Sequence, residues 1–349
     1  MSNFPSISII IPSYNQGKYI ERTILSILKQ EYSGNVQVIV SDGGSSDETV
    51  RILKRYPQLI WWSEPDKGFV DAVTKGFKVA SGDVLAIQSS DDFYLKDAFQ
   101  ITINEFLNSP DFAIITGCDL YMQSDRKNYF CSNLDTHEIT PYSLLMQRVI
   151  PQHCAFFRRE VLDKLGGLRE EVDTCADVDF WYRALHFFKG KFIPYHTAVY
   201  QFHADQRTKV LDSWEDSLIR MVESCEADPK YASRFRLSDL DRKNLYVRWH
   251  FYRTLAFQES KGSFNREYWL HKVSEIMADS DLSEETHGYV QKLAVSYKVI
   301  PNPAQKSRFS RIRESLIDGS FPKKVFNRLL KKNTPYDNVK YVDVNWWNL

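Results

Sequence analysis

The sequence has few cysteines, and their spacing forms no known pattern. The 5 cysteines, at positions 118, 131, 154, 175 and 225, are odd in number and include no Cys-x-x-Cys pair. This argues against a disulfide framework and against a zinc site built from thiolates. We therefore expect reduced thiols, as in a cytoplasmic protein.

Long apolar runs are missing as well. No stretch approaches the roughly 18 consecutive apolar residues that a membrane-spanning helix needs. The N-terminus, Met1-Ser2-Asn3-Phe4-Pro5, leads into a short apolar strand rather than into the core of a signal peptide. The sequence thus predicts a cytoplasmic protein, with peripheral contact to the inner face of the membrane left open.

The chain also lacks net charge, internal repeats and low-complexity segments. It has 45 basic and 45 acidic residues among 349, which gives no support to a nucleic-acid partner for the whole chain. A hydrophobic share of 43% with 26% charged residues is an ordinary globular balance. At about 100–200 residues per domain, this length predicts two domains.

The N-terminal region alternates strand and helix patterns. Residues 7–11 and 36–41 are almost continuous β-branched runs, as in strands that are buried on both faces of a parallel sheet. Between them, Ile20, Ile24 and Ile27 recur at helical spacing. Further elements are a helix after Ser45–Glu48, a helix with Val70, Val73, Phe77 and Ala80, a strand at 84–88, a helix near 96–108 and a strand at 112–116. This order predicts an open α/β sheet with helices on both faces.

Beyond residue 120 the pattern loosens into loops and short strands, and beyond Trp214 it becomes helical. Helices are expected from Trp214 onward and near 238–259, 265–278 and 284–297. We place a domain boundary near residue 212, with a catalytic region over 1–212 and a helical region over 213–349.

Polar clusters follow three of the expected strands. They are Pro12-Ser13-Tyr14-Asn15, Asp42-Gly43-Gly44-Ser45 and Ser89-Ser90-Asp91-Asp92. Ligands bind at the carboxyl ends of the strands in open α/β sheets, so the three clusters should meet at one edge. Two adjacent carboxylates repel each other unless a cation holds them, and Mg²⁺ or Mn²⁺ would suit their oxygen ligands. For an isolated Asp-Asp pair, a solvated helix cap is the alternative.

Taken in order, five segments resemble the family 2 glycosyltransferases with the GT-A fold. They are Ile7–Asn15, Val38–Asp47, Glu64–Gly68, Gly82–Asp92 and Ala176–Arg183, and the likeness extends over about residues 6–205. The resemblance implies a GT-A type nucleotide-binding open sheet and a nucleotide diphosphate sugar donor. It also implies Mg²⁺ or Mn²⁺ and inversion at the anomeric carbon.

Carried over residue by residue, the resemblance assigns the donor site. Asp91 and His203 are the expected metal ligands, and Ser89 departs from the family's Asp-x-Asp pattern at its first position. Asp42 would bind the base or the ribose, and Asp92 would be an alternate ligand or a support for the first one. The nucleotide-sugar-binding residues are Pro12, Tyr14, Asn15, Asp42, Asp66, Gly68, Ser90 and Asp92.

The transfer also needs a base and an acceptor site. Asp177, at the start of an expected helix, matches the family's base position, with Asp179 as its competitor. An aspartate at a helix N-terminus can instead be a cap. Gln152, His153 and Asp179 are candidate acceptor-side residues.

The C-terminal region suggests a further contact. Residues 306–332 carry nine basic and two acidic residues among apolar ones, the pattern of a helix on an anionic membrane surface or of a helix pair with a solvated basic face. The tail over 342–349, with Trp346 and Trp347, would dock on the body or on a partner subunit in a homo-oligomer.

The leading hypothesis is an inverting, metal-dependent glycosyltransferase in surface polysaccharide biosynthesis. It would use a UDP-, GDP- or dTDP-linked donor and a saccharide or lipid-linked saccharide acceptor. A sugar-phosphate nucleotidyltransferase would need a basic, glycine-rich loop where this chain has Pro-Ser-Tyr-Asn-Gln-Gly. The non-enzymatic alternative, suggested by Ser89, is a degenerate nucleotide-sugar-binding subunit.

Overall fold

The structure is a computed structural model, and it divides by its internal contacts into two units. It describes residues 4–122, 129–131, 136–146, 150–201, 203, 214–232, 234, 237–248, 265–296 and 299. The division falls between Arg236 and Leu237, so the helix that follows Trp214 belongs to the first unit. The sequence had suggested a boundary near residue 212.

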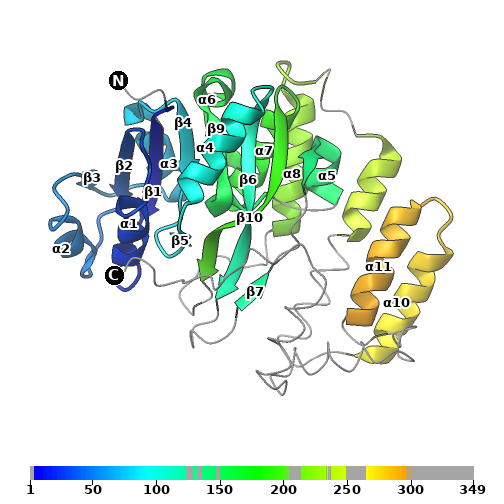
Figure 1. The fold of residues 1–349 in the computed structure, drawn as a ribbon. Helices are drawn as coiled ribbons and strands as arrows, with labels where there is room; N and C mark the ends of the chain where they lie inside the picture. Colours follow the sequence, from blue (N-terminus) through cyan, green and yellow to red (C-terminus); the bar gives the residue numbers. More distant parts are fainter. Residues whose placement is uncertain are drawn as a thin grey trace, which may run out of the picture. The chain divides into compact units, whose positions relative to one another are not determined.

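The first unit is built on one mixed sheet (Figure 1). Its strand order is β3-β2-β1-β4-β9-β6-β10-β5, with β7 beside β6 and β8 beside β10. The strands are β1 (Ile7–Ser13), β2 (Val36–Asp42), β3 (Ile60–Ser63), β4 (Val84–Ile87), β5 (Phe93–Tyr94), β6 (Phe112–Met122), β7 (Tyr129–Cys131), β8 (His137–Ile139), β9 (Ala155–Arg158) and β10 (Lys189–Gln201).

Strand direction determines which loops meet. β1 pairs in parallel with β2 and β4, and β2 pairs in parallel with β3. β9 is antiparallel to both β4 and β6, so β6 runs in the same direction as β4. β10 is parallel to β6 and shares this direction. The carboxyl ends of β1, β2, β3, β4, β6 and β10 therefore lie along the same edge of the sheet.

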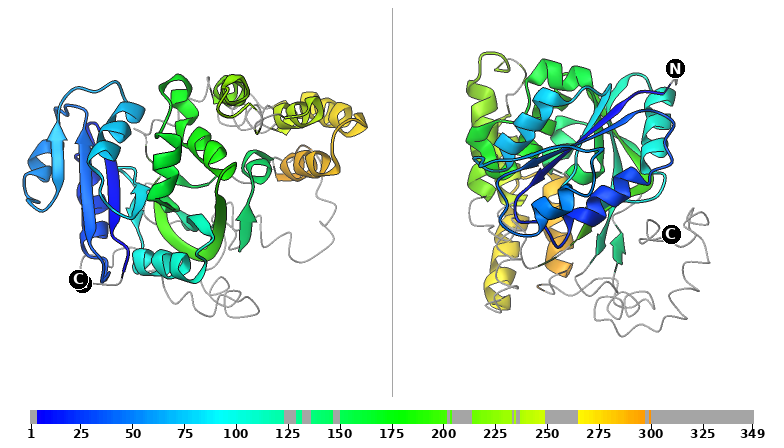
Figure 2. Two further views of the ribbon diagram at one scale, coloured as in Figure 1. Left: turned by 90° about the horizontal axis from the view of Figure 1, so that it is seen from above. Right: turned by 90° about the vertical axis from the view of Figure 1, so that its left-hand side faces the viewer.

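Helices cover both faces of the sheet, as expected (Figure 2). On one face, α1 (Ile20–Leu28), α2 (Thr49–Leu53) and α4 (Ala98–Asn108) share a core with strand residues such as Ile9 and Val38. On the other face, α3 (Phe69–Val79) and α7 (Ala176–Leu185) meet through aromatic rings, and Phe157 of β9 packs on both Phe77 and Trp181. Shorter segments connect these layers: α5 (Pro141–Met146), the 3₁₀ turns η1 (Gln152–Cys154) and η2 (Glu170–Cys175), and α6 (Arg159–Leu165).

Within the described residues the expected elements exist, with different lengths in several places. The helix near 96–108 begins at Ala98, and the helix after Ser45–Glu48 is only the short α2. The edge strand β3 and the two-residue β5 were not expected. β3 is half exposed, and β5 is too short to show alternation, so neither carries a strand pattern of its own.

Helices also make up the described part of the second unit. A helix spans 239–248, and α10 (Arg266–Ala278) packs against α11 (Glu284–Ser296) around buried Trp269, Val273 and Val290. The helix α8 (Trp214–Ala227) precedes them in the first unit. In the part of the chain that the structure describes, no helix combines the length and apolar character needed to cross a bilayer. The basic stretch 306–332 and the tail 342–349 lie outside the described residues.

Candidate active site

The loops after β1 and β2 are joined by hydrogen bonds. Asn15 adopts a left-handed conformation, with φ of 52°. Its backbone N–H donates to Ser45 Oγ (2.7 Å), and its side-chain Oδ1 accepts from the Ser46 N–H (2.9 Å). Asn and Asp tolerate this conformation better than other residues with a Cβ. Asn15 therefore helps to hold the two loops in one arrangement.

Asp42, the last residue of β2, is buried and fully engaged. Its carboxylate accepts hydrogen bonds from the Ser45 N–H (2.9 Å), Ser45 Oγ (2.6 Å) and Ser63 Oγ (2.6 Å). Ser63 ends β3, so Asp42 connects the ends of two neighbouring strands. Asp42 itself is only 1% exposed.

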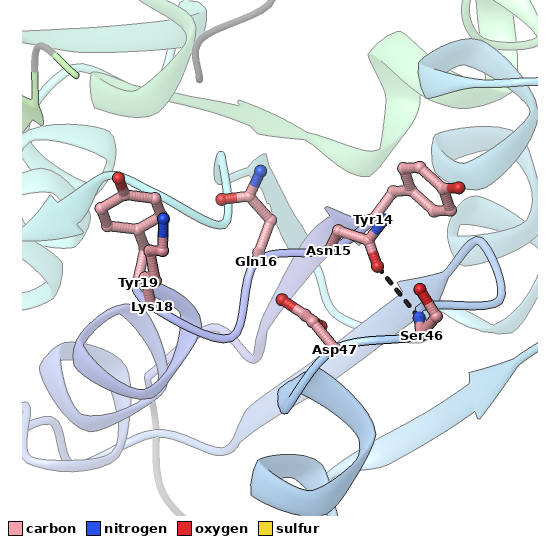
Figure 3. Close-up of a pocket in the computed structure, with 7 residues that line it drawn as sticks. All are labelled: Tyr14, Asn15, Gln16, Lys18, Tyr19, Ser46 and Asp47. Atoms are coloured by element: carbon pink, nitrogen blue, oxygen red, sulfur yellow. Dashed lines mark hydrogen bonds between the residues drawn. The ribbon is translucent and has the colours of Figure 1, made fainter. Parts of the chain in front are cut away.

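A cavity of about 490 Å³ opens beside these loops (Figure 3). Tyr14 and Tyr19 stand at opposite ends of its wall, and Tyr14 is 62% exposed. Tyr14, Asn15, Gln16, Lys18, Tyr19, Ser46 and Asp47 line it. The wall combines two aromatic rings with amide, hydroxyl, ammonium and carboxylate groups, a mixture that suits a polar ligand with a flat ring. Pro12 lies in β1 just before this loop.

Asp66 approaches the same region from the loop after β3. Its Oδ1 accepts the Gly68 N–H at 2.8 Å, and Gly68 has φ of 112°, a region that favours glycine. A Cβ placed on Gly43 would lie 2.7 Å from Asp66 Oδ2. The absence of a side chain at Gly43 therefore lets Asp66 come next to the Asp42 loop.

Asp91 and His203 come together, although they are far apart in the sequence. Asp91 Oδ2 lies 2.8 Å from His203 Nε2, with side-chain exposures of 18% and 4%. Asp91 belongs to the turn after β4, and His203 follows the end of β10. The Tyr19 ring is stacked on the His203 ring, with centroids 4.2 Å apart and planes at 27°.

This pair fits a divalent cation of the kind expected. It supplies a carboxylate and an imidazole, and Asp91 keeps enough exposure to bind an ion from outside. Within the described residues, no group of three or more His, Cys, Asp or Glu side chains could hold a metal by itself. Two protein ligands are consistent with an ion that takes its remaining ligands from substrate phosphates and water.

Asp92 points inward instead. Its Oδ1 accepts the Gln201 N–H at 2.9 Å, and its backbone carbonyl accepts the Thr23 hydroxyl at 2.6 Å. Burial raises the pKa of Asp92 to about 7; the nearby His153 opposes this rise and Asp91 adds to it. The carboxylate is 1% exposed, so this geometry gives it a supporting position behind Asp91 rather than a direct contact with substrate.

The neighbours of Asp92 occupy the same interior. The Thr23 hydroxyl also donates to the Ser90 carbonyl at 2.9 Å, and Ser90 is buried. His153 lies between two carboxylates, 3.7 Å from Asp92 Oδ2 and 3.5 Å from Asp119 Oδ2. His153 is buried, whereas Gln152, beside it in η1, is partly exposed.

The two candidate bases have different surroundings. Asp177 is half-buried in the first turn of α7. Asp179 is 0% exposed and paired with Arg183 (Nε–Oδ2 2.8 Å) and with Arg169. Arg169 also donates to Ser224 Oγ (2.9 Å), which ties α7 to α8. With both oxygens occupied, Asp179 holds helices together and is not available as a base or an acceptor ligand.

The position of Asp177 relative to the sheet follows from the chain path. α7 ends at Leu185, and β10 begins at Lys189, beside the first residue of β6. The C-terminal end of α7 is therefore at the edge where the parallel strands begin. Its N-terminal turn, which carries Asp177, is directed toward the opposite edge, where β1, β2 and β4 end.

Comparison with known proteins shows which family this arrangement belongs to. The family model described as "Glycosyl transferase family 2" matches residues 8–166. An uncharacterized glycosyltransferase of Mycobacterium tuberculosis is 31% identical over 193 residues, which is 53% of this chain and 70% of the relative. The chain belongs to glycosyltransferase family 2. It is a glycosyltransferase, and the resemblance seen in the sequence is confirmed.

Other relatives of this family 2 glycosyltransferase match in part. The chondroitin synthase of Escherichia coli is 28% identical over 185 residues, covering 52% of this chain and 26% of that protein. Among solved structures, S. aureus TarS 1–349 in complex with UDP-GlcNAc has a TM-score of 0.57 at 15% identity, over 84% of this chain and 89% of that one. The latter likeness shows the fold, and the expected GT-A type open sheet is confirmed.

Some residues of the site were missed in the sequence. Tyr19 and Gln16 immediately precede the apolar stripe of α1, so they gave no signal of their own. Ser63 lies in a strand that was not expected, and Asp119 lies inside the apolar strand β6. An aspartate within such a buried run was the signal that could have pointed to the interior around His153.

Proposed function

We propose that this family 2 enzyme is an inverting, metal-dependent glycosyltransferase that uses a nucleotide diphosphate sugar. The observation that carries the proposal is the meeting of the tyrosine-walled cavity with the Asp91–His203 pair through Tyr19. A flat polar group in the cavity and a diphosphate at the pair would then belong to one molecule. The donor is a UDP-, GDP- or dTDP-linked sugar, and all three classes share these parts.

The donor would be held by loops at the ends of β1, β2 and β3. Tyr14 and Asn15 form one wall, and the Asp42 loop lies beside them, where Asn15 hydrogen-bonds both Ser45 and Ser46. Asp66 and Gly68 complete the site from the β3 loop, where the Gly68 backbone approaches without a side chain. Ser90 and Asp92 support the turn that presents Asp91.

Asp91 and His203 would hold Mg²⁺ or Mn²⁺, which would neutralise the charge of the leaving diphosphate. Ser89, which stands at the first position of the family's Asp-x-Asp pattern, fits this division of roles. Ser89 hydrogen-bonds Asp92, and its carbonyl accepts the Asp92 N–H at 3.2 Å, so it shapes the turn. One carboxylate and one imidazole then remain for the ion.

Asp177 would act as the base. In an inverting transfer the acceptor hydroxyl attacks the anomeric carbon as the diphosphate leaves, and the carboxylate takes the hydroxyl proton. The partial exposure of Asp177, in contrast to the full burial of Asp179, supports this choice. Gln152 is the partly exposed residue that we propose for acceptor contact.

Relatives support the class of substrates. One is named chondroitin synthase, and one neighbour in fold was crystallised with UDP-GlcNAc and also with UDP. We therefore infer a saccharide or lipid-linked saccharide acceptor in polysaccharide biosynthesis. Membrane contact or self-association through the C-terminal residues remains part of this proposal.

The test is donor binding and turnover with a panel of sugars. UDP-, GDP- and dTDP-sugars are compared by thermal shift and by nucleotide diphosphate release, each with Mn²⁺ and with EDTA. We expect one nucleotide to stabilise the protein in Mn²⁺ and to be turned over with an acceptor saccharide. Asp177→Asn should lower release by about 10²–10⁴-fold, with Asp111→Asn, an exposed carboxylate, as the matched control. Binding without turnover for every donor and acceptor would favour the nucleotide-sugar-binding subunit that Ser89 suggests.

A further inference from the structure

Tyr19 belongs to two parts of the site at once. Its side chain lines the cavity beside Gln16 and Lys18, and its ring lies on the imidazole of His203. His203 in turn meets Asp91. Tyr19 therefore links the wall of the cavity to the Asp91–His203 pair.

The backbone of Tyr19 is fixed by the start of α1. The carbonyl of Gln16 accepts hydrogen bonds from the N–H groups of Tyr19 (2.9 Å) and Ile20 (2.9 Å). Ile20 and Ile24 are then fully buried in the core beneath the sheet. Because the backbone is held on both sides, the ring of Tyr19 has a defined position from which to contact His203.

His203 lies two residues beyond β10, which ends at Gln201. The ring is held by the Asp91 carboxylate at one edge and by Tyr19 on one face. A stacked neighbour restricts rotation of an imidazole about its Cβ–Cγ bond, which directs Nε2 toward Asp91.

We propose that Tyr19 is a positioning residue that keeps the His203 imidazole oriented toward Asp91 by stacking on its ring. This inference rests on the proposed function, in which Asp91 and His203 bind a divalent cation together with a nucleotide diphosphate. The ring, and not the hydroxyl, performs this role. Phenylalanine should therefore replace Tyr19, and an aliphatic residue should not.

The experiment measures Mn²⁺ binding directly. Free Mn²⁺ is followed by electron paramagnetic resonance during titration of the full chain in the presence of UDP, and UDP affinity is measured separately in EDTA. We expect Tyr19→Phe to bind Mn²⁺ like the wild type. Tyr19→Leu should bind it about 2- to 13-fold more weakly, the range that corresponds to the loss of one aromatic stack.

A double-mutant cycle tests whether the effect passes through His203. In a His203→Ala background, Tyr19→Leu should cause no further loss of Mn²⁺ affinity. Equal weakening in both backgrounds would overturn the inference. So would a fall in UDP affinity in EDTA as large as the fall in Mn²⁺ affinity, because Tyr19 would then act by direct contact with the nucleotide.

The outcomes separate this inference from the proposed function. Wild-type protein that binds no Mn²⁺ with UDP, GDP or dTDP would overturn both. Wild-type binding together with equal affinity in Tyr19→Leu and Tyr19→Phe would overturn the inference alone. Melting temperatures check folding, and Tyr19→Met, which fills more of the space without a flat ring, replaces the leucine variant if that one does not fold.

Discussion

Substituting each of two aspartates two positions apart in α7 should have opposite effects. Asp179 is 0% exposed and Arg183 is 1% exposed, and they form an ion pair at 2.8 Å. Arg169 binds the other oxygen of Asp179. Asp179→Asn would leave two guanidinium groups without their carboxylate in the interior, whereas Asp177→Asn would change a half-buried side chain in the first turn of the helix.

The magnitude for Asp179 follows from the burial of the pair. Removing one partner of a buried ion pair costs about 3–5 kcal/mol, because the remaining charge stays buried without compensation. For a unit of this size, 1 kcal/mol corresponds to about 2–4 °C, so the melting temperature should fall by about 6–20 °C. Asp177→Asn removes a favourable charge at a helix N-terminus, an effect of about 0.3–1 kcal/mol.

The assay combines urea unfolding with turnover per folded molecule. Asp179→Asn should lower the unfolding midpoint with an unchanged m-value and keep turnover in the fraction that is folded. Asp177→Asn should keep the midpoint and lose about 10²–10⁴-fold in turnover, the contribution of a general base. Our assignment of the two residues would be refuted if Asp179→Asn unfolded like the wild type or if Asp177→Asn kept full activity.

Three further changes test the packing behind the site. In Gly76→Ala the new Cβ would lie 2.4 Å from Ile10 Cγ2, so α3 must move off the sheet. Alanine also has a higher helix propensity than glycine, which offsets part of this cost. Urea unfolding should therefore show a free energy of unfolding lower by about 1–2 kcal/mol. Burial, together with Arg234, lowers the pKa of His186 to about 4. The unfolded chain therefore binds a proton on His186 more tightly than the folded chain does, and the free energy of unfolding should fall as the pH falls from 6.5 toward 4. Over this range, the melting temperature of His186→Gln should depend less on pH than that of the wild type. Thr23→Val removes the hydroxyl that donates to the carbonyls of Ser90 and Asp92 in the turn before β5. Turnover at saturating metal should fall, whereas the affinity for UDP measured in EDTA should stay unchanged.

The parallel half of the sheet was predictable because its signals are local. The runs at 7–11 and 36–41 are apolar on both faces, and only a strand covered by helices on both sides buries such a run. Each of these strands ends in a polar cluster, and parallel strands end at the same edge of a sheet. The sequence could therefore predict that Asp42 and Asp91 lie along one edge. The described site keeps these residues at that edge.

The orientation of individual side chains was not predictable in the same way. Whether Asp92 or Asp91 faces outward depends on how Gln201 of β10 meets the turn, a contact between residues 109 positions apart. The burial of Asp179 depends similarly on Arg169 and on α8. A sequence pattern records which residues are charged, and the distant partners that neutralise those charges appear only once the strands and helices are assembled.

The place of β10 between β6 and β5 has a consequence for synthesis on the ribosome. The strands β1, β2 and β4 are neighbours, so their loops can assemble early in the nascent chain. β5, which follows the turn with Asp91, finds its partner only when Ala198 and Val199 have emerged, and His203 comes later still. A fragment that stops at residue 166, where the family match ends, would have the donor loops but neither α7 nor β10. Under the proposed function, competence to cleave a sugar nucleotide would therefore arise late in translation, only after α7, β10 and His203 have left the ribosome.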